Sequence, residues 1–248
     1  MKFPFHSNLV EGIIQSRPNR FIMIVTIEGN IHRCHCPATG RIGEIRFNNV
    51  PCLLSKASNT DRKTKYTVEA ISLDKIGAKK KNWIGINQGR MNDYLDFFIG
   101  QGLLERMVGR LSEIKREVTV GKSRIDFLLI NSIGNPTYLE AKTIVMAVPN
   151  KNRPDIAVKP KKFSSFERLI RHFGALVHEK KKGKRAIILL CFPYDAIPFQ
   201  PPKPDKGSRK IQHAARAASN SGVESWQLNF KVSKSGVSLL DYFRLDMF

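Results

Sequence analysis

The arrangement of apolar runs changes near residue 80, and this change constrains the fold more than any other feature of the chain. Before it, short runs rich in β-branched and aromatic residues alternate with turn signals such as Glu28-Gly29-Asn30. After it, strand-like runs are separated by runs with helical spacing. The sequence therefore predicts two units: a small β-barrel over residues 1–80 and an α/β (α+β) domain with a mixed sheet over residues 81–248.

The first unit has the size and strand pattern of an OB-like barrel, which holds about five short strands. Its clearest strand-like runs are Phe21–Ile27, Ile31–Cys36, Val50–Ser55 and Lys65–Ile71. The open face of such a barrel commonly binds single-stranded or irregular nucleic acid in a basic groove.

The second unit starts with a helical pattern and continues with a hairpin-like pair of strands. The predicted elements are, in order, a helix over Asn92–Met107, strands over Ile114–Val120, Arg124–Ile130 and Thr137–Thr143, a helix over Phe163–Lys180, a buried strand over Ala186–Phe192, a helix over Arg209–Ser219 and a final strand over Glu224–Val232. The helix histidines His172, His178 and His213 are predicted to lie on helix surfaces.

The charge of the chain indicates a polyanionic partner. Lys and Arg number 42 against 21 Asp and Glu, which gives a formal net charge of +21 at pH 7. Nucleic acid is the commonest such partner, because each phosphate neutralised by Lys or Arg releases condensed counterions. An anionic membrane surface is the rival interpretation. It is disfavoured because the basic residues are spread along the chain instead of lining one amphipathic helix. We therefore expect DNA, with RNA as a second option, and no membrane partner.

The cellular setting follows from what the chain lacks in sequence. Its first 15 residues contain no continuous apolar core, and no later run approaches the roughly 20 apolar residues that span a bilayer. Four cysteines in 248 residues are too few for a disulfide framework. These features predict a cytoplasmic protein. They leave the oligomeric state open, a homodimer included.

The residues with catalytic chemistry concentrate in the predicted hairpin. In Leu139-Glu140-Ala141-Lys142 the strand period places Glu140 and Lys142 on one face. A turn over residues 131–135 would bring Asp126, from the preceding apolar strand, close to Glu140. Two carboxylates with waters and a phosphate suit a hard cation, Mg²⁺ or Mn²⁺. Asp126, Glu140 and Lys142 are thus the predicted catalytic residues of a PD-(D/E)XK-type phosphodiester hydrolase, with the two carboxylates as metal ligands and Lys142 acting on the attacking water.

Two structural alternatives remain open at this point. An Asp126–Lys142 or Glu140–Lys142 ion pair would equally satisfy a partly buried sheet.

The basic residues predicted to contact nucleic acid are Arg20, Arg41, Arg62, Lys63, Arg124, Lys161 and Lys162. Those on the barrel are equally compatible with solvated strand-edge charges that only prevent aggregation.

A set of short motifs along most of the chain resembles one known family. The motifs are Arg20-Phe21, His35-Cys36-Pro37 with Thr39-Gly40, Asp61-Arg62-Lys63-Thr64, Asn87, Asn92, Ser123-Arg124-Ile125-Asp126-Phe127-Leu128-Leu129 and Glu140-Ala141-Lys142. Together they resemble the sugar fermentation stimulation protein A (SfsA) family. The resemblance implies an N-terminal OB-like domain, a C-terminal PD-(D/E)XK nuclease-like domain, DNA binding, a DNA/RNA nuclease activity and an effect on sugar utilisation genes. It also places His35 in a turn near the binding face.

The chain departs from the family pattern at three positions. Ala38 stands where the family has Asn, Phe97 where it has a helix Glu, although Asp96 is adjacent, and Ser165 where it has a His. The last two changes bear on catalysis and leave DNA binding untouched. Two hypotheses result: a metal-dependent endo- or exonuclease, or a non-catalytic DNA-binding regulator of sugar utilisation on a nuclease-like scaffold.

Overall fold

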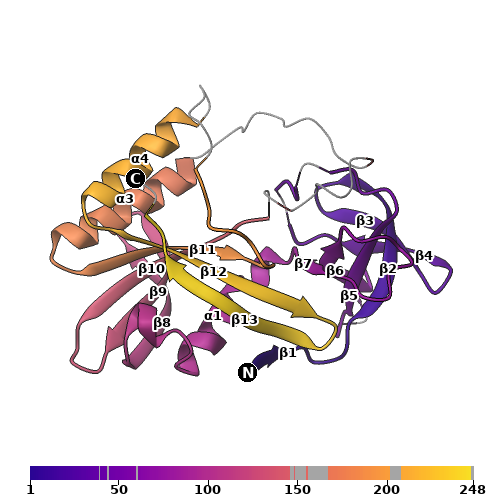
Figure 1. Cartoon of the computed structure of the whole chain (residues 1–248), viewed down its shortest axis with the longest axis horizontal. Helices are drawn as coiled ribbons and strands as arrows, with labels where there is room; N and C mark the ends of the chain where they lie inside the picture. Colours follow the sequence, from indigo (N-terminus) through magenta and orange to yellow (C-terminus); the bar gives the residue numbers. More distant parts are fainter. Residues whose placement is uncertain are drawn as a thin grey trace.

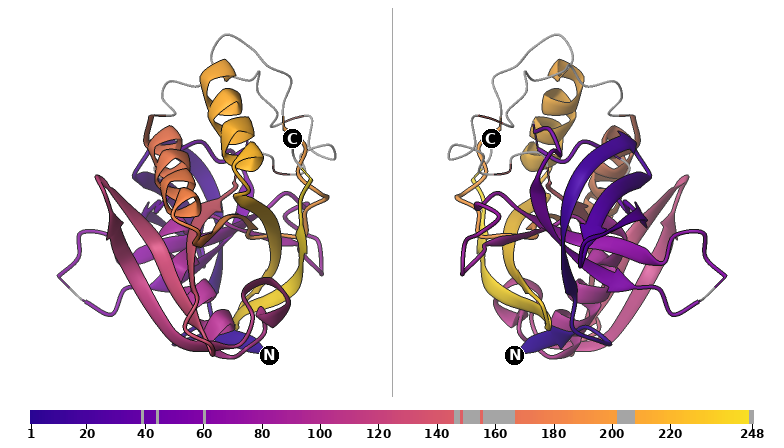
Figure 2. Two further views of the ribbon diagram at one scale, coloured as in Figure 1. Left: turned by 90° about the vertical axis from the view of Figure 1, so that its left-hand side faces the viewer. Right: turned by 90° about the vertical axis from the view of Figure 1, so that its right-hand side faces the viewer.

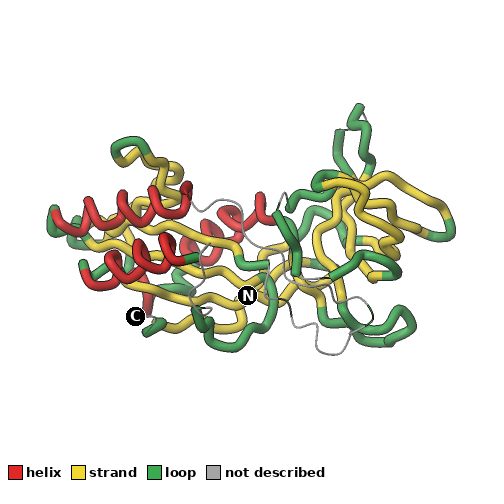
Figure 3. Tube along the Cα trace, turned by 90° about the horizontal axis from the view of Figure 1, so that it is seen from above, coloured by secondary structure: helices red, strands yellow, loops and turns green. Residues whose placement is uncertain are grey.

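We analysed a computed structural model of the chain. It describes residues 1–246 except 39, 44, 60, 146–147, 149–154, 156–166 and 202–207. The described strands belong to one hydrogen-bonded sheet that curls into a barrel at one end and carries helices at the other (Figure 1). Seen from above, the barrel and the helix-covered part lie side by side along the long axis (Figure 3). None of the described helices is long and apolar enough to cross a membrane.

Five strands form the barrel. They are β2 (Val10–Asn19), β3 (Ile22–Ile27), β4 (Asn30–His35), β5 (Val50–Lys56) and β6 (Tyr66–Ser72). β4, β3, β2, β5 and β6 pair in that order, and a parallel contact between His35 and Thr67 joins β4 to β6 and closes the barrel. Met23, Val25 and Cys34 point inward and are fully buried. This closed five-stranded arrangement is that of an OB-like barrel, as predicted.

The second part is a mixed sheet. Its strands are β8 (Leu111–Val120), β9 (Ser123–Asn131), β10 (Pro136–Thr143), β11 (Arg185–Phe192), β12 (Glu224–Ser233) and β13 (Gly236–Arg244). β8, β9 and β10 form antiparallel hairpins, whereas β10, β11 and β12 run parallel. The residues of β11 after Arg185 are apolar and buried, as expected of a central parallel strand covered on both faces.

Helices cover both faces of this sheet. α3 (Glu167–Lys181) and α4 (Arg209–Asn220) pack beside each other on one face, which Figure 2 shows from the helix end. α1 (Met91–Gly100) packs on the other face. Its buried residues, Met91, Tyr94, Leu95, Phe98 and Ile99, follow the spacing of one helix face.

Short elements connect the two parts. β7 (Trp83–Gly85) pairs with β6 and, through Trp83 and Val232, with β12. The turn η1 (Gln88–Arg90) leads from β7 into α1. At the other end, β1 (Lys2–Pro4) pairs with β13, so the chain start joins the mixed sheet. The division at residue 80 remains a prediction.

The observed elements differ from the predicted ones in the first helix of the second unit and in several additional strands. The helix expected over Asn92–Met107 is split: α1 ends at Gly100, Gly102 adopts a φ of +70°, and a short α2 (Glu105–Val108) follows. The strand over Glu224–Val232 is not the last, because β13 follows and pairs with it. β1, β2, β7 and β13 escaped prediction. β1 and β7 are only three residues long, and β2 and β13 do not alternate regularly between buried and exposed residues.

Candidate active site

The β9–β10 hairpin brings the two predicted metal ligands together. The register runs from Ile130 opposite Pro136 to Phe127 opposite Leu139, so the next facing positions are Asp126 and Glu140. The Asp126 N–H donates to Glu140 Oε2 (3.3 Å), and the Ala141 N–H donates to Asp126 Oδ2 (2.8 Å). These hydrogen bonds bring the two carboxylates close together at the end of the hairpin, where Asp126 is also contacted from α1 and Glu140 from α3.

Glu140 is a buried carboxylate with two nitrogen partners. Its side chain is 1% exposed, and Oε1 contacts both Lys142 Nζ and His172 Nδ1. Lys142 Nζ also lies 3.2 Å from His172 Nδ1. Burial acts to raise the pKa of Glu140, but the hydrogen bond with His172 and the charge of Lys142 outweigh it and hold that pKa below its ordinary value. Glu140 therefore favours its ionised form.

Asp126 shows the opposite shift. Burial, followed by the nearby charge of Glu140, raises the pKa of Asp126 above its ordinary value. Two adjacent carboxylates that cannot both ionise cheaply create a demand for a cation between them. The opposed pKa directions of Asp126 and Glu140 thus mark the hairpin as an electrostatically unusual position in the sheet.

His172 belongs to this cluster, and its prediction as a helix-surface residue was wrong. The side chain is 7% exposed because α3 packs this face against β9, β10 and β11. A sequence signal was available, since His172 shares a helix face with Leu169, Phe173 and Leu176. A histidine on the apolar face of a helix needs a polar partner, and Glu140 provides it.

The donor set at the hairpin suits a hard divalent cation. Asp126 and Glu140 offer carboxylate oxygens, the ligands that Mg²⁺ and Mn²⁺ prefer. Within the described ranges, no group of three or more His, Cys, Asp or Glu side chains is arranged to hold a metal ion. The fit therefore rests on two carboxylates, and water and a substrate phosphate would provide the other ligands.

Both parts of the chain match models of one family. The model described as the SfsA N-terminal OB domain matches residues 16–86, and that of the sugar fermentation stimulation protein RE domain matches residues 90–236. The chain belongs to the SfsA family. A sugar fermentation stimulation protein homolog from a Synechococcus strain is 31% identical, with 95% of this chain and 92% of that protein covered. The Clostridium perfringens homolog is 30% identical, with 96% of each covered.

A solved SfsA structure has the same fold. The structure of Pyrococcus furiosus SfsA in complex with Ca²⁺ is 26% identical to this chain, covers 98% of each chain and superposes with a TM-score of 0.74. The predicted fold class is thus confirmed: an OB-like barrel precedes an α+β domain with a mixed sheet, which the RE-domain model matches.

The residues of α1 at and near the position where the chain departs from the SfsA family pattern make the following contacts. Phe97 packs edge-on against Phe3, with ring centroids 5.5 Å apart, and Asp96 lies 3.5 Å from Arg116 on the exposed side of α1. Asn92, at the start of α1, instead donates a hydrogen bond to Asp126 Oδ1 (2.9 Å). In this member of the SfsA family, α1 therefore presents an amide to the hairpin. Ser165 lies outside the described residues.

Most of the barrel residues predicted to contact nucleic acid are accessible to solvent, and two of them lie near each other. Arg62 and Lys63 are exposed, Arg41 is half-buried, and Arg20 is exposed with its guanidinium 4.7 Å from the ring centroid of Phe21. His35 is half-buried, and its pKa is lowered by burial and then by the charge of Arg62. His35 and Arg62 thus lie within electrostatic reach of each other.

The remaining predicted contacts lie in the second part of the chain. Arg124 is exposed on β9 and forms an ion pair with Glu117 (3.3 Å). Lys161 and Lys162 lie outside the described residues.

Proposed function

We propose that this SfsA-family protein binds DNA and hydrolyses phosphodiester bonds as a metal-dependent nuclease. One observation carries the proposal: Asp126 and Glu140 face each other across a hairpin, with Lys142 on the same face and in contact with Glu140. This is the residue set that a two-carboxylate, one-lysine hydrolytic site requires. The RE-domain match and the Ca²⁺ in the Pyrococcus furiosus relative support it.

Each residue has a distinct role in the proposed reaction. Asp126 and Glu140 would hold a divalent ion, Mg²⁺ or Mn²⁺, which when bound polarises the scissile phosphate and stabilises its developing charge. Lys142 Nζ orients the attacking water from the same face of β10. His172, on Glu140 Oε1, fixes the rotamer of that carboxylate, as the outer partners of metal ligands commonly do.

Nucleic-acid binding rests on charge and on the barrel. A net charge of +21 provides affinity that is independent of sequence. This affinity decreases as the salt concentration rises, because the release of condensed counterions into more concentrated salt is less favourable. Arg20, Arg62 and Lys63 are exposed on the barrel and provide phosphate contacts there. Arg124 is the corresponding candidate beside the hairpin. We propose DNA as the substrate and RNA as a second substrate.

A cleavage assay tests the proposal. End-labelled single- and double-stranded DNA and RNA are incubated with Mg²⁺, with Mn²⁺ or with a chelator. We expect cleavage that requires metal and is lost in Lys142→Met. The matched variant Lys122→Met, altered in the exposed β8–β9 turn, should retain it. Salt-sensitive binding without cleavage by the parent protein would contradict the nuclease proposal and favour the non-catalytic regulator.

A further inference from the structure

Two buried amide side chains on β12 hold a surface loop in place. Gln227 and Asn229 are 0% and 3% exposed. Gln227 Nε2 donates to the carbonyl oxygens of Ala196 (3.4 Å) and Ile197 (3.1 Å), and Asn229 Nδ2 donates to that of Ala196 (2.6 Å). The Phe199 N–H in turn donates to Gln227 Oε1 (2.8 Å). The backbone of residues 196–199 is thus fixed by hydrogen bonds to the buried side-chain amides of β12.

The loop presents one apolar side chain to solvent. Ile197 is 85% exposed, whereas Ala196 and Phe199 pack against the core, with the Phe199 ring centroid 6.3 Å from that of Phe192. Pro198 follows directly and restricts the backbone further. A single exposed isoleucine is ordinary on a protein surface. Ile197, however, projects from a backbone that is hydrogen-bonded to the buried amides of Gln227 and Asn229 and is followed by the packed ring of Phe199.

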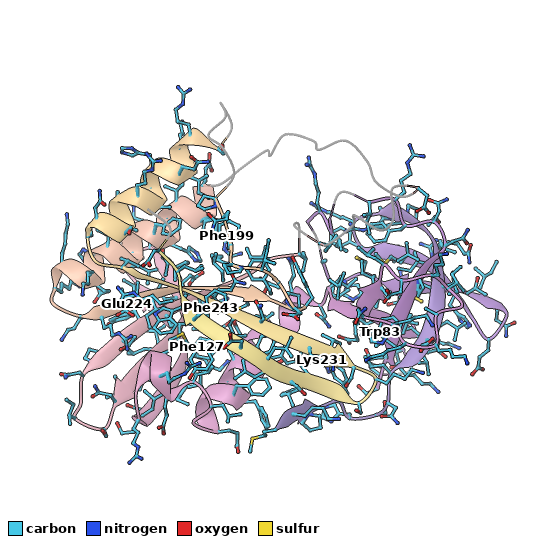
Figure 4. All side chains as sticks on the ribbon, in the orientation of Figure 1. Trp83, Phe127, Phe199, Glu224, Lys231 and Phe243 are labelled. Atoms are coloured by element: carbon cyan, nitrogen blue, oxygen red, sulfur yellow. The ribbon has the colours of Figure 1, made fainter. Side chains whose placement is uncertain are left out.

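The anchor lies in the same row of the sheet as the candidate active site. Lys142 on β10 is opposite Leu190 on β11, and Leu190 is opposite Gln227 on β12. Facing residues of paired strands share a face, and neighbouring strands lie about 4.8 Å apart, so Gln227 lies about 10 Å from Lys142 across the sheet. Figure 4 shows Phe199 on the helix side of the strands, between the helices and the barrel.

We propose that Ile197 is a wedge that contacts base steps of bound DNA next to the cleaved phosphate. Proteins that distort a duplex commonly insert an apolar side chain, isoleucine or proline among them, between base pairs. Insertion requires a stiff backbone behind the side chain, and Gln227 and Asn229 provide one. The inference rests on the proposed function and specifies its substrate class.

If Ile197 inserts between base pairs, the protein should prefer duplexes with a local defect over fully paired ones. Unstacking is cheapest at a mismatched or already unpaired base, so such a step accepts Ile197 more readily than a fully paired one. The preferred substrate is therefore DNA with a mismatch or a similar local defect. Nothing in this argument requires the identity of the mismatched bases to be recognised, because the contact is apolar.

A binding experiment without cleavage tests the wedge. Two duplexes, one matched and one with a central mismatch, contain 2-aminopurine beside the central position, and binding is measured in the presence of a chelator. The parent protein should bind the mismatched duplex about tenfold more tightly, the equivalent of burying much of one isoleucine side chain, and should increase 2-aminopurine fluorescence. Ile197→Ala should lose both effects and keep its affinity for the matched duplex.

Ile133 provides a matched control. It is 78% exposed in the turn between β9 and β10, so Ile133→Ala removes the same side chain from another site and should behave like the parent. Equal discrimination by the parent and Ile197→Ala would overturn the wedge. A parent that binds both duplexes equally in the chelator without a fluorescence increase, and that cleaves both once Mg²⁺ replaces the chelator, would overturn the wedge and leave the nuclease proposal standing. A parent that binds neither duplex would refute both.

Discussion

The side-chain amide of Asn92 donates a hydrogen bond to Asp126 Oδ1 over 2.9 Å, which ties the first turn of α1 to the β9–β10 hairpin. The Ala141 N–H occupies the other carboxylate oxygen of Asp126. The two donors fix the orientation of a carboxylate that burial would otherwise favour in its neutral form.

Asn92→Ala should therefore weaken metal binding without unfolding the chain. Removing an outer partner of a metal ligand typically reduces affinity by about 10- to 100-fold. Calorimetric titration with Ca²⁺ would measure the change. Asn220→Ala, at the exposed end of α4, serves as the control and should leave the affinity unchanged. Equal affinities for Asn92→Ala and the parent would show that this hydrogen bond does not position Asp126 for metal.

His172→Phe should slow cleavage and reduce stability together. The substitution retains an aromatic ring on α3 but leaves Glu140 Oε1 with Lys142 alone. We expect cleavage to fall by about 10-fold or more and the free energy of unfolding to fall by about 1–3 kcal/mol. Urea denaturation and initial cleavage rates would measure the two effects. His178→Phe, exposed on the same helix, should change neither, and unchanged kinetics in His172→Phe would remove His172 from the site.

Gly236→Ala should destabilise the contact between the chain start and β13. A Cβ at residue 236 would lie 2.1 Å from the Phe3 carbonyl oxygen, a backbone atom that cannot rotate away. The strand pair β1–β13 must then shift, and overpacking of this kind costs about 1–3 kcal/mol. The midpoint of urea unfolding should decrease accordingly. Gly77→Ala is the matched variant, because no atom lies within 4 Å of its added Cβ. Identical midpoints for the two variants would contradict the close approach.

Glu224 should contribute to the loss of stability in acid. Burial acts to raise its pKa, but hydrogen bonds from Arg185, at 2.7 and 2.8 Å, and from Trp226 hold the pKa below its ordinary value. Because the folded pKa is the lower one, the stabilisation is fully present above the unfolded pKa, about 4.3 for Glu, and is lost as the pH falls through the folded value. Glu224→Gln should thus lose less stability than the parent between about pH 6 and about pH 3.

The acid effect is measured by urea unfolding at several pH values. Glu113→Gln alters an exposed pair with Lys115 and should follow the parent curve. A Glu224→Gln protein whose stability falls with acid as steeply as that of the parent would show that the Arg185 pair does not shift the pKa of Glu224.

The sequence predicted the hairpin well because two independent signals agreed. The apolar strand around Asp126 and the Glu140–Lys142 alternation required a common sheet face, and the intervening turn fixed the register. Of the barrel strands, β3 was recognisable because its buried residues alternate with half-buried ones, and β5 and β6 because they are short, almost continuously buried runs. Local periodicity was sufficient wherever a strand is regular.

Contacts between distant segments could not be predicted in this way. His172 meets Glu140 across 32 residues and Asn92 meets Asp126 across 34, and no local pattern specifies either pairing. β13 was missed because its buried and exposed residues follow no regular alternation. The hydrogen bonds of Gln227 could not be predicted for the same reason, because their acceptors lie in a loop some 30 residues earlier.

The most direct test of the proposed nuclease site is metal-dependent cleavage by Asp126→Asn, an isosteric change that removes the negative charge. The new amide oxygen can still accept from the Ala141 N–H, and the new NH₂ group can donate to Asn92 once the Asn92 amide flips. Asp195→Asn, at an exposed position, is its matched control. With Mg²⁺ or Mn²⁺ and a confirmed fold, we predict that Asp126→Asn loses cleavage of labelled DNA and keeps its salt-sensitive DNA binding, whereas Asp195→Asn retains both. Undiminished metal-dependent cleavage by Asp126→Asn would contradict the assignment of the β9–β10 hairpin as the active site.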